Sequence, residues 1–118
     1  MRDDEHKVQK AIAQYLDMIG AMYFAIPNGG NRNVITASKL KSEGVKKGVP
    51  DLCILKDGQA HFLEIKKPKT DTPKGYLSKE QKAMIERINE AGCDVAVIHS
   101  VGELVEMLNK WGFKWARK

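Results

Sequence analysis

The sequence predicts a mixed α/β fold in which one central sheet is flanked by helices. Helical patterns occur in four segments, short apolar runs of strand length lie between them, and an Asp-Gly pair joins two of these runs into a hairpin. The predicted order is helix, strand, helix, strand, strand, helix, strand, helix. Because 118 residues suit one domain, we expect a single domain over residues 1–118.

The first half of the chain is predicted to hold a helix, a strand, a loop and a short helix, at residues 5–19, 21–27, 28–33 and 34–44. Apolar side chains such as Ile12 and Leu16 recur at helical spacing in the first of these segments. Asp3 or Asp4 can cap the start of that helix, and Gly20 can end it. The loop is predicted from its composition, NGGNRN.

The second half is predicted to hold two strands, a helix, a strand and a final helix, at residues 51–55, 60–66, 78–92, 94–100 and 100–112. The two strands form a hairpin because Asp57-Gly58 accepts the positive φ angles of a type I′ turn. Ser78 and Gln81 fit a capping box, and Ser100 fits an N-cap. The elements therefore alternate as expected for a mixed sheet with helices.

Two acids lie in this hairpin, where apolar residues are expected. With Asp57-Gly58 as the turn, antiparallel pairing places Asp51 directly opposite Glu64, and the alternation of side chains places Lys66 on the same face. The opposite face, which we expect to be the core face, carries Leu52, Ile54, Leu63 and Ile65. The hairpin therefore predicts two carboxylates and one ammonium group side by side.

Like charges directly opposite each other destabilise a sheet, and more so where the dielectric is low. Protonation of one acid, a cation between the two acids, or a shift of register would relieve the repulsion of Asp51 and Glu64. A divalent cation is the simplest of these, since Mg²⁺ is commonly held by one or two carboxylates with water and phosphate oxygens. Alternatively, Asp51 caps a strand start after Pro50, while Glu64 and Lys66 form a surface ladder.

The first helix carries a third acid in an unusual position. Glu5, Gln9, Ile12 and Leu16 fall on one side of the helix, so Glu5 extends the apolar stripe rather than the solvated face. An acid at a helix start is also favoured by the helix dipole. The dipole explains the presence of the acid but not its direction, and both interpretations stay open for Glu5.

Composition and charge indicate what kind of partner, metal site and cell compartment to expect for this protein. The net charge of +5 comes from 20 Lys and Arg against 15 Asp and Glu, which suggests an anionic partner, most often nucleic acid. Cys53 and Cys93 are far apart, and no Cys/His cluster indicates a structural zinc site. With no signal peptide and no membrane-spanning run, we expect a soluble cytoplasmic protein, of a bacterial or phage-infected cell.

The motif and its surroundings resemble a known family. Pro50-Asp51, twelve further residues and Glu64-Ile65-Lys66 look like the PD-(D/E)xK nuclease motif. Around it stand the helix-start acid Glu5, NGG before Arg32, the run GVPDL, the strand LEIK and the helix start LSKEQ. Together, from Glu5 to about His99, these features resemble the VRR-NUC family, the virus-type replication-repair nucleases.

The resemblance implies a restriction-endonuclease-like fold and a metal-dependent nuclease that cleaves DNA in repair or recombination. It implies that Asp51, Glu64 and the Ile65 carbonyl bind Mg²⁺ or Mn²⁺, with Glu5 assisting at the metal. Lys66 would orient or deprotonate the attacking water, although a plain phosphate contact is the alternative. Gln81 would lie near the site, with its capping box as the alternative role. Small members of the family resemble homodimers that act on branched DNA such as four-way junctions.

Basic residues flank the motif on both sides in sequence. The residues that we expect to contact the DNA backbone are Arg32, Lys39, Lys46, Lys47, Lys67 and Lys69. For each of them alone, a solvated surface position is the alternative. The three histidines are separated and form no metal pattern.

Other functions are compatible with the sequence. A non-catalytic DNA-binding module or a dimeric replication assembly factor could keep the same fold, although a binding module has no need of opposed acids. The apolar residues available for a dimer contact include Met22, Tyr23, Trp111, Phe113 and Trp115. A packed final turn is the alternative for the tryptophans.

Overall fold

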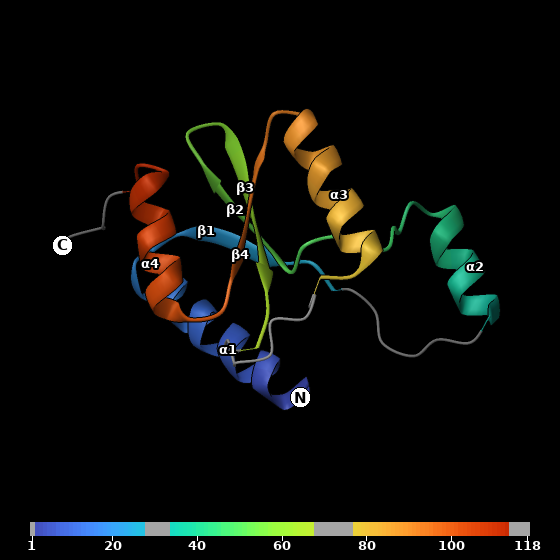
Figure 1. Cartoon of the computed structure of the whole chain (residues 1–118), viewed down its shortest axis with the longest axis horizontal. Coiled ribbons are helices and arrows are strands. Elements are labelled where there is room, and N and C mark those ends of the chain that lie inside the picture. Colours follow the sequence, from blue (N-terminus) through green and yellow to red (C-terminus); the bar gives the residue numbers. More distant parts are fainter. Residues whose placement is uncertain (1, 28–33, 68–76, 114–118) are drawn as a thin grey trace.

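The computed structural model describes residues 2–27, 34–67 and 77–113 and confirms the predicted order of elements (Figure 1). In chain order the elements are α1 (Arg2–Met18), β1 (Met22–Ala25), α2 (Val34–Ser42), β2 (Leu52–Lys56), β3 (Gln59–Ile65), α3 (Lys79–Glu90), β4 (Asp94–Ile98) and α4 (Val101–Lys110). Their bounds differ from the predicted ones by at most about three residues. The predicted loop at 28–33 lies outside the described residues.

Side-chain caps explain where α3 and α4 begin, but not where α1 begins. The predicted cap of α1 by Asp3 or Asp4 is wrong, because α1 begins at Arg2 and both acids lie in its first turn, where the helix dipole favours them. The predicted capping box of α3 is confirmed, since the Ser78 hydroxyl accepts from the Gln81 N–H and Gln81 accepts from the Ser78 N–H. The Ser100 hydroxyl likewise accepts from the N–H of Glu103 at the start of α4.

The sheet is mixed and has the strand order β1-β2-β3-β4. β2 pairs antiparallel with β1 and β3, and β3 pairs parallel with β4. The hairpin turn has φ angles of 51° at Asp57 and 80° at Gly58, as a type I′ turn requires. The pairing of Leu52 with Leu63 confirms the predicted register over β2, from Leu52 to Lys56, which the turn sets residue by residue.

One face of the sheet forms the core with α1 and α4. The four hairpin residues that we expected on this face are all buried, and they pack with Ile12 and Leu16 of α1 and with Leu104 and Leu108 of α4. The full set of buried core residues is Ile12, Leu16, Leu52, Ile54, Leu63, Ile65, Ala96, Ile98, Leu104 and Leu108. This core holds the strands rigidly, which fixes the side chains on the opposite face.

The opposite face carries Glu64 and is only partly covered. α3 lies over the half of this face that belongs to β4, while Met22, Phe24 and Leu55 on β1 and β2 are 59%, 45% and 40% exposed. α2 stands apart from the sheet, beyond α3 in Figure 1.

Two further properties concern membranes and thiols. Among the described residues, no helix has the length and apolar character needed to cross a bilayer. Cys53 and Cys93 are free thiols, and burial raises the pKa of Cys53 above its ordinary value.

Candidate active site

Main-chain hydrogen bonds hold Asp51 between β3 and the residue that follows β1. Its N–H donates to the Leu63 carbonyl at 2.9 Å, and its carbonyl accepts from the Ile26 N–H at 2.8 Å. The side-chain Oδ2 accepts from the N–H of Ile65 at 2.7 Å. The bond to Ile26 continues the β1–β2 ladder by one residue, whereas the bond to Leu63 is shifted by one residue from the β2–β3 register. Asp51 therefore does not form the predicted ladder pair with Glu64, and its carboxylate faces the end of β3.

Among the described residues, Glu64 is an acid whose side chain is buried. It is 2% exposed, its Oε2 accepts from Gln81 Nε2 at 2.9 Å, and its Oε1 is buried with no hydrogen-bond partner among the described residues. Burial, and then the negative charge of Asp51, raise the pKa of Glu64 to about 8. A buried carboxylate oxygen without a partner is costly. Glu64 therefore needs a proton or a cation at Oε1.

Asp51 and Glu64 lie close together, although not as the directly opposite pair that the hairpin register predicted. Their side chains are close enough to share a hydrogen bond when one of them is protonated, and that contact also raises the pKa of Glu64. The alternative for Glu64 as part of a surface ladder is wrong, because its side chain is buried. Two carboxylates this close repel each other when both are ionised, and a divalent cation bound between them would lower that repulsion.

The charges of Lys66 and Glu5 have opposite effects on the pKa of Glu64. The Lys66 N–H donates to the Ile98 carbonyl at 3.0 Å, and its ammonium charge lowers the pKa of Glu64, opposing the burial. The charge of Glu5, on the half-buried side of α1, raises that pKa. The structure thus brings Glu5, Asp51, Glu64 and Lys66 into one electrostatic neighbourhood, at the end of β3 and near the start of α1.

The carboxylates do not form a cluster of three around one point. Within residues 2–27, 34–67 and 77–113, no group of three or more His, Cys, Asp and Glu side chains is close enough to hold one ion. Asp51 and Glu64 are thus a pair of acids in the described part of the chain, and their binding of a metal stays a prediction. The assistance of Glu5, for example through water, stays a prediction, as does the Ile65 carbonyl.

Gln81 performs both of the roles that the sequence left as alternatives. Its Oε1 accepts from the Ser78 N–H at 2.9 Å and closes the capping box, while its Nε2 donates to Glu64 Oε2. One amide thereby joins the start of α3 to the buried carboxylate. Oε2 accepts this one bond, and Oε1, which has no hydrogen-bond partner among the described residues, is the more available oxygen for a ligand.

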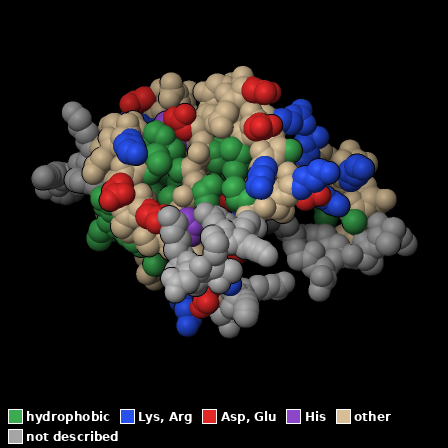
Figure 2. Space-filling model, viewed as in Figure 1, with side chains coloured by type: hydrophobic (Ala, Val, Ile, Leu, Met, Phe, Trp, Pro, Cys, Tyr) green, Lys and Arg blue, Asp and Glu red, His purple; other side chains and the backbone are tan. Residues whose placement is uncertain are grey.

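The predicted DNA-contacting residues are only partly within the described chain. Lys39 is on α2, Lys46 and Lys47 are in the loop before β2, Lys67 follows the motif, and all four are exposed. Arg32 and Lys69 lie outside the described residues. Figure 2 shows Lys and Arg side chains gathered on the side of the molecule that carries α2 and α3. Their role in binding stays a prediction.

Gly48, the first residue of the run GVPDL, has a role in this neighbourhood that was not predicted from the sequence. Its backbone touches the first turn of α3 at Glu80 and Gln81. The signal in the sequence was a glycine three residues before Asp51. Only the packing of the loop against α3 reveals why a glycine stands there.

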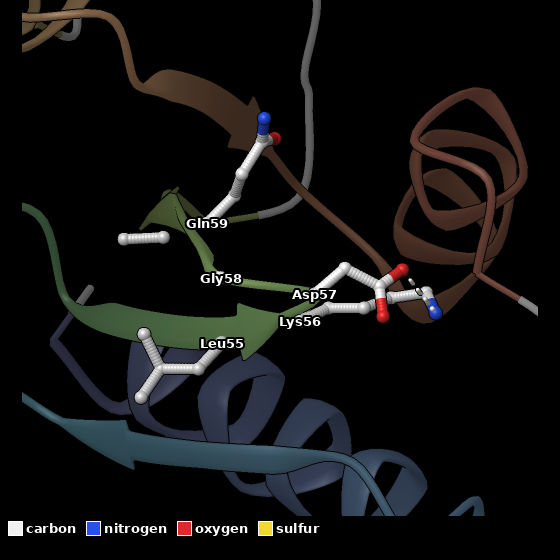
Figure 3. A pocket seen from close by; sticks show the side chains of 6 residues that line it. Leu55, Lys56, Asp57, Gly58 and Gln59 are labelled. Carbon is white, nitrogen blue, oxygen red and sulfur yellow. Dashed lines mark ion pairs between the residues drawn. The ribbon is translucent and has the colours of Figure 1, made fainter.

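A hollow elsewhere on the surface is unrelated to the acids. It has a volume of about 460 Å³ and is lined by residues 55–60 of the hairpin, including the ion pair of Lys56 and Asp57 at 3.1 Å (Figure 3). This hollow lies at the turn, the opposite end of β2 from Asp51. We assign no function to it.

Comparison with known proteins identifies related sequences and structures. The family model described as the VRR-NUC domain matches residues 7–102. A solved structure titled "VRR_NUC domain" is 24% identical, with a TM-score of 0.62, and the match covers 93% of this chain and 98% of that one. The likeness to that solved structure supports the fold described above for this chain. No curated protein matches the chain.

Proposed function

Because the chain belongs to the VRR-NUC domain family, we propose that it is a divalent-metal-dependent endonuclease that hydrolyses phosphodiester bonds in DNA. The observation that carries this proposal is the buried Glu64 carboxylate, which lies beside Asp51 with one oxygen lacking a hydrogen-bond partner among the described residues. A protein that only binds DNA does not require two acids in such contact. The proposal takes residues 1–118 as one nuclease domain.

The oxygen set fits Mg²⁺ or Mn²⁺. Asp51 and Glu64 would hold the ion, since each offers a carboxylate oxygen and their mutual repulsion falls when a cation binds. The Ile65 carbonyl and Glu5 are the further candidates. When bound, the ion would supply Lewis-acid polarisation of the phosphate and a lowered pKa for water.

The side chains of the protein have separate roles in this proposal. Lys66 orients or deprotonates the attacking water, or stabilises charge on the phosphate, from the same strand face as Glu64. Gln81 holds Oε2 of Glu64, so that the carboxylate presents Oε1 to the ion. Asp51 is fixed by the N–H of Ile65, which keeps its second oxygen oriented. These contacts restrict both acids before any ligand binds.

The exposed lysines would track the phosphate backbone. Lys39, Lys46 and Lys47 lie on α2 and the following loop, and Lys67 directly follows Lys66. Arg32 and Lys69 are proposed from the sequence. Such contacts position DNA without reading its sequence. A preference for structure, such as a four-way junction, would then come from the arrangement of two active sites.

We propose a homodimer because a four-way junction is two-fold symmetric and needs two paired cuts. Of the five apolar residues named for a contact, Met22 is exposed and Tyr23 is half-buried, with its hydroxyl bonded to Asp17 at 2.8 Å. Trp111 and Phe113 pack against the core, and Trp115 lies outside the described residues. Met22 with its neighbours Phe24 and Leu55 is therefore the apolar surface offered to a second copy.

A cleavage assay tests the proposed reaction. Duplex, flap and four-way-junction DNA are incubated with the protein and Mg²⁺ or Mn²⁺, with and without a chelator. We expect metal-dependent strand cleavage that the chelator abolishes and that Asp51→Asn lacks. A purified protein that binds these substrates but cuts none of them with either metal would instead favour a DNA-binding module or an assembly factor.

A further inference from the structure

The loop before β2 passes over the first turn of α3 at Gly48. Gly48 has a φ of 82°, a conformation that side chains rarely adopt. A Cβ atom at this position would lie 2.5 Å from the Glu80 carbonyl oxygen and 2.9 Å from the Gln81 nitrogen. These are main-chain atoms of a helix, so neither can swing aside. The close approach of loop and helix requires a glycine.

Gly48 connects two parts of the candidate site. Along the chain it is followed by Val49, buried Pro50 and then Asp51. Across the contact lies Gln81, whose side-chain Nε2 donates to Glu64 Oε2 at 2.9 Å. The separation of the loop from α3 therefore sets how far the Gln81 amide stands from the buried carboxylate.

We infer that Gly48 is a positioning residue of the carboxylate pair, acting through Gln81. The absence of a side chain at Gly48 lets α3 approach closely enough for the Gln81 amide to hold Oε2 of Glu64. Without that bond, both oxygens of a buried carboxylate would lack a donor, and the carboxylate would be free to turn. The consequence for cleavage rests on the proposed function, whereas the contact itself can be tested without DNA.

Gly48→Ala tests the inference, and Gly44→Ala is its matched control. Gly44 has a φ of 101°, so alanine brings backbone strain at both positions, but a Cβ at Gly44 meets nothing within 4 Å. At Gly48 the start of α3 would have to recede by about 1 Å to restore ordinary contact. That displacement is enough to break the hydrogen bond between Gln81 and Glu64.

The first measurement uses metal-free protein. The side-chain amide resonances of Gln81, assigned by NMR with Gln81→Ala, should move in Gly48→Ala and stay unchanged in Gly44→Ala. Titration with Mn²⁺ should show weaker binding for Gly48→Ala alone. Both readings remain valid even if the protein proves to cleave no DNA, so failure of the inference and failure of the proposed nuclease activity are distinguishable.

The second measurement is the single-turnover cleavage rate at saturating metal. Gly48→Ala should lower this rate about 100-fold, the usual cost of an ångström-scale misplacement, and Gly44→Ala by less than about threefold. In a Gln81→Ala background, Gly48→Ala should add little, because both changes remove the same bond.

Three results would overturn the inference. The Gln81 amide resonances could stay unchanged in a folded Gly48→Ala protein. The rate losses of Gly48→Ala and Gln81→Ala could multiply, which would mean that they act independently. Gly48→Ala could unfold at the assay temperature while Gly44→Ala stays folded, which would make Gly48 a residue of the whole fold rather than of the site.

Discussion

Replacing Glu64 by glutamine should make the metal-free protein more stable in alkaline solution. The substitution keeps the shape of the side chain and removes its ionisation. Burial and Asp51 raise the pKa of Glu64 from 4.5 to about 8, so the folded protein holds a proton that the unfolded chain releases. The stability that this proton contributes is fully present below pH about 4.5 and is lost as the pH rises through about 8.

The size of the effect follows from that pKa difference. A shift of one pKa unit corresponds to about 1.4 kcal/mol, so the free energy of unfolding of the wild-type protein should fall by on the order of 3–5 kcal/mol between pH 5 and pH 9. For a chain of this size the midpoint of thermal unfolding should fall by roughly 10–20 °C more in the wild type than in Glu64→Gln.

Thermal unfolding followed by circular dichroism, in buffers with chelator from pH 5 to pH 9, measures this difference. Glu86→Gln is the control, because Glu86 is an exposed acid on α3, the helix that carries Gln81. We expect the wild type and Glu86→Gln to lose stability in parallel with rising pH, and Glu64→Gln to lose much less. At pH 9, Mg²⁺ should stabilise the wild type and leave Glu64→Gln unchanged, since a ligand stabilises only the state that binds it.

Parallel pH profiles for the wild type and Glu64→Gln would refute this reasoning. They would mean that Glu64 ionises in the folded protein at no cost, and that the missing partner of Oε1 is supplied by solvent. Equal stabilisation of both proteins by Mg²⁺ would place the metal somewhere other than at Glu64.

Four other predictions concern cleavage, DNA binding and assembly. Asp51→Asn should abolish cleavage in a nicking assay and leave DNA affinity, measured by fluorescence anisotropy, nearly unchanged; retained cleavage would remove Asp51 from the metal site. Lys66→Ala should lower the single-turnover rate about 10²–10⁴-fold with little change in Mn²⁺ affinity, whereas a rate restored by excess metal would make Lys66 structural. Replacing Lys46 and Lys47 together by alanine should flatten the slope of log affinity against log salt by about 2, and an unchanged slope would place DNA elsewhere. Light scattering at micromolar concentration should report twice the chain mass of 13.2 kDa, and Phe24→Ser should shift the reading towards one chain; a wild-type monomer that still nicks DNA would remove the symmetric model.

Much of the fold follows from interactions between residues that are close together in the sequence. Asp57-Gly58 selects one turn type, and because side chains alternate along strands, that turn places Leu52 opposite Leu63 and sends both to the core. Ser78 and Gln81 mark the start of α3 through a reciprocal pair of hydrogen bonds. Such features need only neighbours in sequence or one hairpin, so they can be worked out without a structure.

What the sequence could not decide depends on contacts between distant segments. The Gln81 side chain can cap its own helix from local information, but its bond to Glu64 exists only because α3 packs on this face of the sheet. The same packing leaves Glu64 Oε1 buried and raises the pKa of the carboxylate. Asp3 and Asp4 were misassigned as caps because an acid just before a helix and an acid in its first turn produce the same sequence pattern. The role of Gly48 depends on such a contact too: a Cβ atom at this position would lie within 3 Å of the α3 backbone, and only the tertiary structure brings that backbone there.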